Sequence, residues 1–470
     1  MGQPVRWRCR LGKREIRKNH MNDQISHPAS QTPSPAPKRS RLDSQKVIVV
    51  LSVIMAMQMT SFVMIAPLFA RRFDEFGAGV KALGISAMAF ALTTAISAPF
   101  MGALADRFGR RPLILGSLAA YCAAFAGYLL APSAVVLILV RGLAGAFTAG
   151  LMPAVTGLAT DLAPEERRAQ WIAFVIGGAS FGWVAGPIAG GMIFDRWGYS
   201  TALIVSIGLA ALTFLVALLG VPESRPAADR SFPVRTSGTS HGQRKNLKDS
   251  LSNLRSTLPT SLSAFLVLLF IYFAVLFAWT FMEPELMFYA YNDLGWSSSM
   301  LGLAMSAFGV SMMVGVFAFG RSSDRLGRKP VILFGLALFS AQFIGLAFFK
   351  SFFVITASFL IAGMGNALFD PALTASILDI SPEEHRARIL GIKYATGSIG
   401  NVLGPALVVL LTSAVSTAGI FLIALGMVLL AIIAASTIRT APLPSRVQPD
   451  LKAVRKKTTS AQATDGGELS

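Results

Sequence analysis

Long apolar runs without charge constrain this chain more than any other feature of its sequence. Residues 82–105 are 24 consecutive positions without an ionisable side chain. A run of about 18 such residues is long enough to cross the ~30 Å hydrocarbon core of a bilayer as a helix. An open sheet would leave backbone groups unpaired in lipid, so these runs must be helical. The chain is therefore predicted to be an all-α membrane protein.

Twelve such runs occur along the 470 residues, of which 53% are hydrophobic and only 14% charged. They cover residues 47–70, 82–105, 113–131, 133–158, 169–193, 199–221, 262–290, 299–320, 330–349, 352–376, 388–413 and 416–437. The polar segment between the sixth and seventh runs divides them into two sets of six. We expect a disordered cytoplasmic tail at 1–46, a six-helix bundle at 47–221, a cytoplasmic linker at 222–261, a second six-helix bundle at 262–437 and a disordered cytoplasmic tail at 438–470.

The basic residues are distributed asymmetrically between the predicted loops. With the N-terminus placed in the cytoplasm, 35 of the 42 Lys and Arg residues lie in cytoplasmic segments and five in the opposite loops. This is the positive-inside bias of membrane proteins, so both termini are expected in the cytoplasm. The net charge of +18 is thereby explained by topology, and no nucleic-acid partner is expected. The first 46 residues lack the apolar core that a cleavable signal peptide needs.

A repeat with a spacing of 218 residues relates the two sets of runs. The stretch "GALADRFGRRP" at 102–112 returns as "GRSSDRLGRKP" at 320–330, and "DLAPEERR" at 161–168 returns as "DISPEEHR" at 379–386. One offset serves separate places without a gap, which indicates duplication of a six-helix unit. Six is an even number, so both copies enter the membrane in the same sense and form parallel repeats.

These motifs and the twelve runs resemble the major facilitator superfamily of transporters, and "GALADRFGRR" resembles that superfamily's signature between helices 2 and 3. The resemblance implies a latch on the cytoplasmic side that holds one state shut and breaks in the other. Asp106 would face the start of helix 11 near Arg388, Arg110 would reach Asp161, and the second copy would mirror both contacts. The alternative is that the charged turns only set topology and turn geometry. The predicted latch residues are Gly102, Asp106, Arg107, Gly109, Arg110, Asp161, Gly320, Asp324, Arg325, Gly327, Arg328 and Asp379.

The latch glycines have separate local reasons. Gly102 is expected to allow close approach of a neighbouring helix, and Gly109 to supply the positive φ of a tight turn. Pro112 suits the first turn of the next helix.

The fifth run carries a glycine-rich pattern, "GWVAGPIAGG". It resembles the helix 5 signature of drug:proton antiporters, which implies export. Close helix packing in lipid, to which small residues at four-residue spacing are suited, explains the pattern equally well. The residues concerned are Gly182, Gly186, Pro187, Gly190 and Gly191.

Ionisable residues inside membrane helices are expensive and are candidates for function. Arg141 lies in "RGLAG", which resembles the superfamily's helix 4 signature associated with proton movement; it could instead bond backbone carbonyls. Asp370 could carry a proton or form a static pair with Lys393. Glu283 could bind a proton or a cation, or mark a wet helix end. Gln58 is a further candidate for proton or substrate binding, because it lies among the methionines of the first run, whose adaptable side chains suit a promiscuous cavity.

We find no phosphate-binding loop and no cluster of metal ligands, so no enzyme activity, cofactor or metal is expected. The sequence predicts a secondary transporter of the bacterial inner membrane, monomeric and multi-pass, which exports lipophilic or cationic drug-like compounds in exchange for protons by alternating access. Two alternatives are a transporter of one metabolite such as a sugar, and a transporter-like sensor that moves nothing.

Overall fold

The computed structural model describes residues 41–164, 167–222, 261–319 and 326–438, and the described residues contain helices and no strand. The described residues from Leu42 onward form one compact unit. The helices of the first half are α1 (Arg41–Ile65), α2 (Leu68–Glu75), α3 (Gly79–Phe108), α4 (Arg110–Leu130), α5 (Ala134–Thr148), α6 (Leu151–Leu162) and α7 (Arg168–Gly220). Those of the second half are α9 (Leu262–Phe288), η3 (Tyr289–Asp293), α10 (Ser298–Phe319), α12 (Arg328–Phe339), α13 (Ala341–Phe348), α14 (Phe352–Asp379), η4 (Glu383–His385), α15 (Arg386–Leu411) and α16 (Thr417–Thr437).

The helices account for twelve membrane spans. Eleven segments of the described chain are long and apolar enough to cross a bilayer, and one of them covers 51 residues, Gln170–Gly220. This segment belongs to α7, which turns at Gly198, where φ is 79°. Only glycine adopts that conformation without strain, so α7 supplies both the fifth and the sixth span. The predicted all-α class and its twelve-helix layout are confirmed.

The first helix differs from the prediction at its start. It begins at Arg41, whereas the apolar run begins at residue 47, because a helix can extend beyond the hydrocarbon core into water. Three segments lie outside the described residues: 1–40 of the first predicted tail, 223–260 of the linker and 439–470 of the second tail. The predicted domain boundaries therefore stay predictions.

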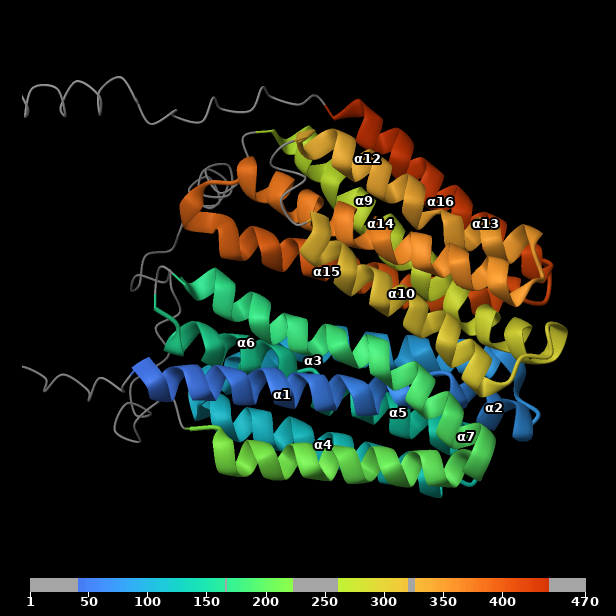
Figure 1. Ribbon diagram of the computed structural model, residues 1–470, viewed down its shortest axis with the longest axis horizontal. Helices are drawn as coiled ribbons and strands as arrows, with labels where there is room; N and C mark the ends of the chain where they lie inside the picture. Colours follow the sequence, from blue (N-terminus) through green and yellow to red (C-terminus); the bar gives the residue numbers. More distant parts are fainter. Residues whose placement is uncertain (1–40, 165–166, 223–260, 320–325, 439–470) are drawn as a thin grey trace, which may run out of the picture. The chain divides into compact units, whose positions relative to one another are not determined.

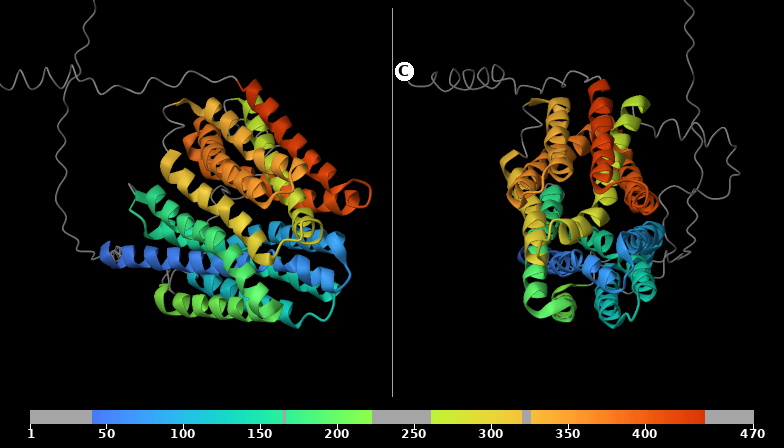
Figure 2. Two further views of the ribbon diagram at one scale, coloured as in Figure 1. Left: turned by 45° about the vertical axis from the view of Figure 1, so that its right-hand side comes forward. Right: turned by 90° about the vertical axis from the view of Figure 1, so that its right-hand side faces the viewer.

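The two halves lie beside each other and meet along two seams. In Figure 1 the helices α1 to α7, blue to green, occupy one side, and α9 to α16, yellow to red, occupy the other. One seam joins α7 to α10 and the second joins α3 to α15, and the views of Figure 2 show the same grouping of helices. The repeat relates the two seams, because spans 5 and 8 correspond to spans 11 and 2.

Glycines bring the backbones together at both seams. A Cβ atom on Gly302 of α10 would overlap the carbonyl oxygen of Pro187 on α7. The repeat-related pair is Gly84 of α3 and Pro405 of α15, where the same distance is 3.4 Å. These contacts lie toward the helix ends that the sequence assigns to the outside, so the halves touch at that end.

The glycine pattern of the fifth span packs α7 against α1. Cβ atoms on Gly182, Gly186 and Gly190 would each lie within about 3 Å of the α1 backbone or its Met side chains. Lipid supplies no hydrophobic drive between helices, so this close packing itself stabilises the pair. The structure thus shows a packing role for these glycines, while their role in export stays a prediction.

We expect Gly190→Ala to destabilise the protein, because the added methyl group would overlap the carbonyl oxygen of Met64. Overpacking of this kind costs about 1–3 kcal/mol. Gly208→Ala, also in α7, is the matched control, because no atom lies within 4 Å of the methyl group there. Melting in detergent measures the effect, and equal melting temperatures of the two variants would contradict the packing argument.

Candidate functional site

A central cavity of about 420 Å³ lies between the two halves. Helices α1, α3, α5 and α7 line it from the first half, and α9, α10, α12, α14 and α15 from the second. A cavity shared by two parallel repeats is the usual position of a transporter's binding site.

The walls of this cavity are mainly apolar and aromatic. The ring and thioether side chains lining it are Phe62, Phe90, Trp183, Trp279, Met305, Phe308, Met312 and Phe339. The polar ones are Thr94, Thr280, Asn366, Ser398 and Asn401. Polarisable rings and thioethers adapt to ligands of different shape, so this lining favours lipophilic guests over one polar metabolite. Sequence reasoning did not single out the two asparagines, because nothing in the sequence indicates which faces of their helices point into the cavity.

Two of the predicted residues, Arg141 and Glu283, line this cavity from opposite halves. Arg141 belongs to α5, and its guanidinium lies 4.1 Å from the ring centroid of Phe69. Its Nη1 atom is buried and finds no hydrogen-bond partner among the described residues, which argues against a structural role in bonding backbone carbonyls. Glu283 belongs to α9. The cavity therefore holds one basic and one acidic side chain.

The other two candidates, Gln58 and Asp370, are not among the residues that line the cavity. Gln58 is fully buried in α1, and its side-chain amide has no hydrogen-bond partner in the described part of the chain. Asp370 pairs with Lys393, whose Nζ lies 2.8 Å from Oδ1 of the carboxylate. Lys393 also donates to Thr374 at 2.6 Å and lies 4.2 Å from the centroid of the Tyr272 ring. The geometry thus favours the static pair.

The charged turns have the same geometry in both halves. Gly109 and Gly327 have φ of 98° and 91°, as a turn between two helices requires. Arg110 Nε lies 3.4 Å from Asp161 Oδ2, and Arg328 Nε lies 3.1 Å from Asp379 Oδ2. Each ion pair lies within one half, so neither pair by itself joins the halves.

Gly102 and Arg107, the remaining latch residues that the structure describes, show no contact between the halves. Arg107 is exposed at the end of α3. A Cβ atom on Gly102 would meet nothing within 4 Å, so the expected close helix approach at this position is absent from this conformation. The side chain of Asp106 and the residues Gly320, Asp324 and Arg325 lie outside the described part of the chain. Latching across the halves stays a prediction.

Two basic residues next to the charged turns, Arg111 and Lys329, contact the C-terminal ends of helices. Arg111 Nη2 donates to the carbonyl oxygen of Leu218 at 2.9 Å, and Lys329 Nζ donates to that of Ser436 at 2.6 Å. Donors and acceptors are both related by the 218-residue offset. A cation at a helix C-terminus satisfies carbonyls that have no partner within the helix. The repeat of "RRP" as "RKP" was the available signal.

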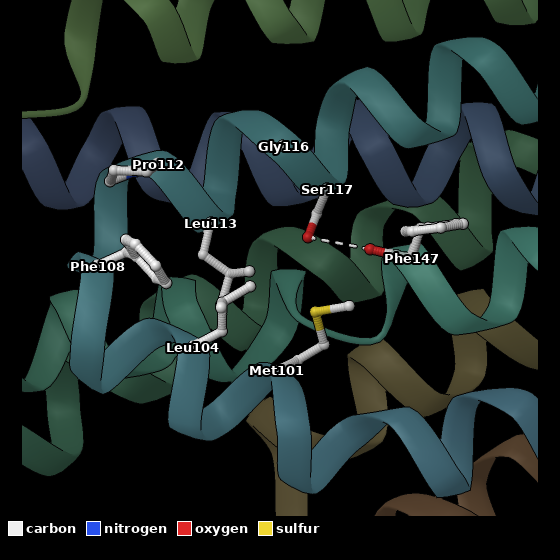
Figure 3. A pocket seen from close by; sticks show the side chains of 8 residues that line it. All are labelled: Met101, Leu104, Phe108, Pro112, Leu113, Gly116, Ser117 and Phe147. Atoms are coloured by element: carbon white, nitrogen blue, oxygen red, sulfur yellow. Dashed lines mark hydrogen bonds between the residues drawn. The ribbon is translucent and has the colours of Figure 1, made fainter.

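A second pocket, of about 400 Å³, lies at the surface of the first half between α3, α4 and α5. Figure 3 shows its walls, which are apolar apart from Ser117, and that hydroxyl donates to the carbonyl of Phe147 at 3.4 Å. No charged side chain is among its lining residues, so the pocket offers little to orient a ligand. No group of three or more potential metal ligands occurs in the described residues.

The duplicated helices, the seams between the halves and the cavity shared by them define a membrane transporter rather than an enzyme. A sequence profile described as Major Facilitator Superfamily matches residues 48–289 and 265–464. The chain belongs to this superfamily.

Several relatives are drug-resistance proteins. The tetracycline resistance protein, class B, of Escherichia coli is 28% identical over 77% of this chain and 87% of its own length. The multidrug resistance protein MdtG of Proteus mirabilis is 26% identical over 68% of this chain and 76% of its own. The multi-drug resistance efflux pump PmrA of Streptococcus pneumoniae is 24% identical over 68% and 77%.

Solved structures support the fold. A bacterial homologue of the human lysosomal transporter Spinster, inward-facing and unoccupied, has a TM-score of 0.65 at 16% identity and covers 86% of this chain and 100% of that one. The human organic anion transporter MFSD10 has a TM-score of 0.60 at 20% identity, over 83% and 99%.

We expect Asp370→Asn to destabilise the protein by about 1–3 kcal/mol, because it leaves the buried ammonium of Lys393 without its counter-charge. The second substitution, Lys393→Met, removes that ammonium and keeps an apolar side chain in the space of the lysine methylenes. The double variant should therefore regain the parent's melting temperature and dye transport. A folded double variant that does not transport would show that the pair takes part in transport and is not only structural.

Proposed function

We propose that the protein exports lipophilic or cationic drug-like compounds across the bacterial inner membrane in exchange for protons, by alternating access. The observation that carries the proposal is the central cavity, which combines aromatic and Met walls with one acid and one base from opposite halves. The drug-resistance relatives support the same substrate class. We further propose that both termini are cytoplasmic and that the protein works as a monomer.

Glu283 is the proposed coupling residue. In its ionised form the carboxylate attracts a cationic guest, and in its protonated form that attraction is lost. Arg141 faces the same cavity from the other half and competes with the guest for the carboxylate. Proton and drug would thus bind in turn, as antiport requires.

The glycines of α7 and the charged turns serve the motion in this proposal. The glycine pattern of the fifth span packs α7 tightly against α1. The two helices can then move as one rigid pair when the seam with α10 opens and closes. The ion pairs of Arg110 and Arg328 keep each cytoplasmic turn rigid within its own half. A transporter of one sugar is not favoured, because hydrogen-bonding side chains are the minority of the cavity lining.

We expect inverted membrane vesicles that hold a proton gradient to lose part of it when a fluorescent lipophilic cation is added. Glu283→Gln should abolish this loss, because the amide cannot exchange a proton, and an effect of more than about tenfold on coupled flux is expected for loss of a proton-transfer group. Asp293→Asn, an exposed acid on the outer surface, is the control and should behave as the parent protein. Normal coupling in Glu283→Gln would remove the residue from the mechanism.

A further inference from the structure

The side-chain carboxylate of Asp195, in the first half, forms hydrogen bonds with the second half. Asp195 lies in α7 where the fifth span gives way to the sixth, and it accepts the backbone N–H groups of Ser298 at 3.0 Å and Ser299 at 2.7 Å. The hydroxyl of Ser299 also donates to it. These two serines begin α10, so an acid of the first half caps a helix of the second.

A second set of contacts holds the same segment against α2. The ring of Tyr291, in η3, lies under the guanidinium of Arg71 at 4.0 Å, and its hydroxyl donates to the carbonyl of Pro67 at 3.1 Å. Arg71 also donates to the carbonyl of Trp296 at 3.3 Å. Residues 291–299 are therefore held between α2 and the outer turn of α7. We call Asp195, Arg71, Tyr291, Ser298 and Ser299 the outer clasp.

The Asp195 contact is the stronger part of the outer clasp. An anion at a helix N-terminus satisfies N–H groups that have no partner within the helix and interacts favourably with the helix dipole. Hydrogen bonds to an ionised acceptor are roughly twice as strong as those between neutral groups. Ser298 is fully buried, whereas Asp195 and its hydrogen bonds with Ser299 are exposed, so the contact lies at the solvent edge of the seam.

Asp195 and Ser298 of the outer clasp have no counterparts of the same kind at the repeat-related positions. The position equivalent to Asp195 is Ser413, and the position equivalent to Ser298 is Val80. At that related seam, the described contacts near Gly84 are with Val408, Val409 and the backbone of Pro405. One seam thus carries a charged tie and the other is held by apolar packing.

We infer that the outer clasp is a gate whose breaking controls opening of the transporter to the outside, and that Asp195 sets how often it opens. The inference rests on the alternating access of the proposed function. The seam of α7 and α10 must part for the cavity to reach the outside, whereas the apolar seam of α3 and α15 can slide without breaking a charged contact.

The test is labelling of a buried position at the seam. In full-length protein with Cys9→Ser and Cys122→Ser, Ser298→Cys places a thiol where the native hydroxyl has no hydrogen-bond partner among the described residues. A membrane-impermeant maleimide is applied to right-side-out vesicles without drug or proton gradient. Asp195→Asn should raise the labelling rate by about tenfold, as loss of a charge-assisted contact predicts. Asp293→Asn, exposed on the same segment, should not change it.

Ser299→Ala keeps the carboxylate and both backbone hydrogen bonds, so a smaller rise in labelling rate is expected. If Asp195→Asn fails to fold, as judged by melting, Ser299→Ala decides the question. Labelling rates equal to the parent in the folded variants would overturn the gate. Labelling does not require transport, so the two proposals can fail separately. If the parent exports dyes but Asp195→Asn leaves the labelling rate unchanged, only the clasp is refuted. If the parent exports nothing but Asp195→Asn raises the labelling rate, only the export function is refuted.

Discussion

Contact between backbones at glycine is the interaction on which the rest of this structure depends. Hydrocarbon surrounds the spans, so apolar side chains gain little by leaving lipid for a neighbouring helix. Helices must instead approach closely enough for dispersion and carbonyl contacts to add up. Gly190 allows this between α7 and α1, and Gly302 and Gly84 allow it across the two seams. The helices of both seams also line the cavity that the halves share.

Duplication explains why so many contacts occur twice. Arg110 and Asp161 recur as Arg328 and Asp379, and the cation that binds the end of the sixth span recurs at the twelfth. These contacts lie within one half, where each copy had to fold as a unit. Contacts between the halves have diverged, as the acid at position 195 and its serine counterpart show.

Sequence reasoning predicted the helical class, the twelve spans and the repeat, because lipid leaves the backbone few choices and hydropathy records them directly. It also singled out Arg141 and Glu283, since a charge within a span is conspicuous. It could not tell that Asp370 is paired whereas Glu283 lines the cavity, because depth and facing depend on how the helices rotate in the bundle. Gln58 was predicted as a proton or substrate candidate, but it lies in the core, and this too depends on how its helix is rotated in the bundle. Asp195 gave no signal, because its partners are backbone groups about a hundred residues away.

The two charged groups of the cavity come from different copies of the ancestral unit. Arg141 has Phe359 as its counterpart, and Glu283 has Ile65. The scaffold is thus close to twofold, but its electric field is not. A guest with separated charges therefore meets a base from one half and an acid from the other, so its two opposite orientations in the pocket differ in energy. A nearly symmetric frame has in this way acquired a directional interior.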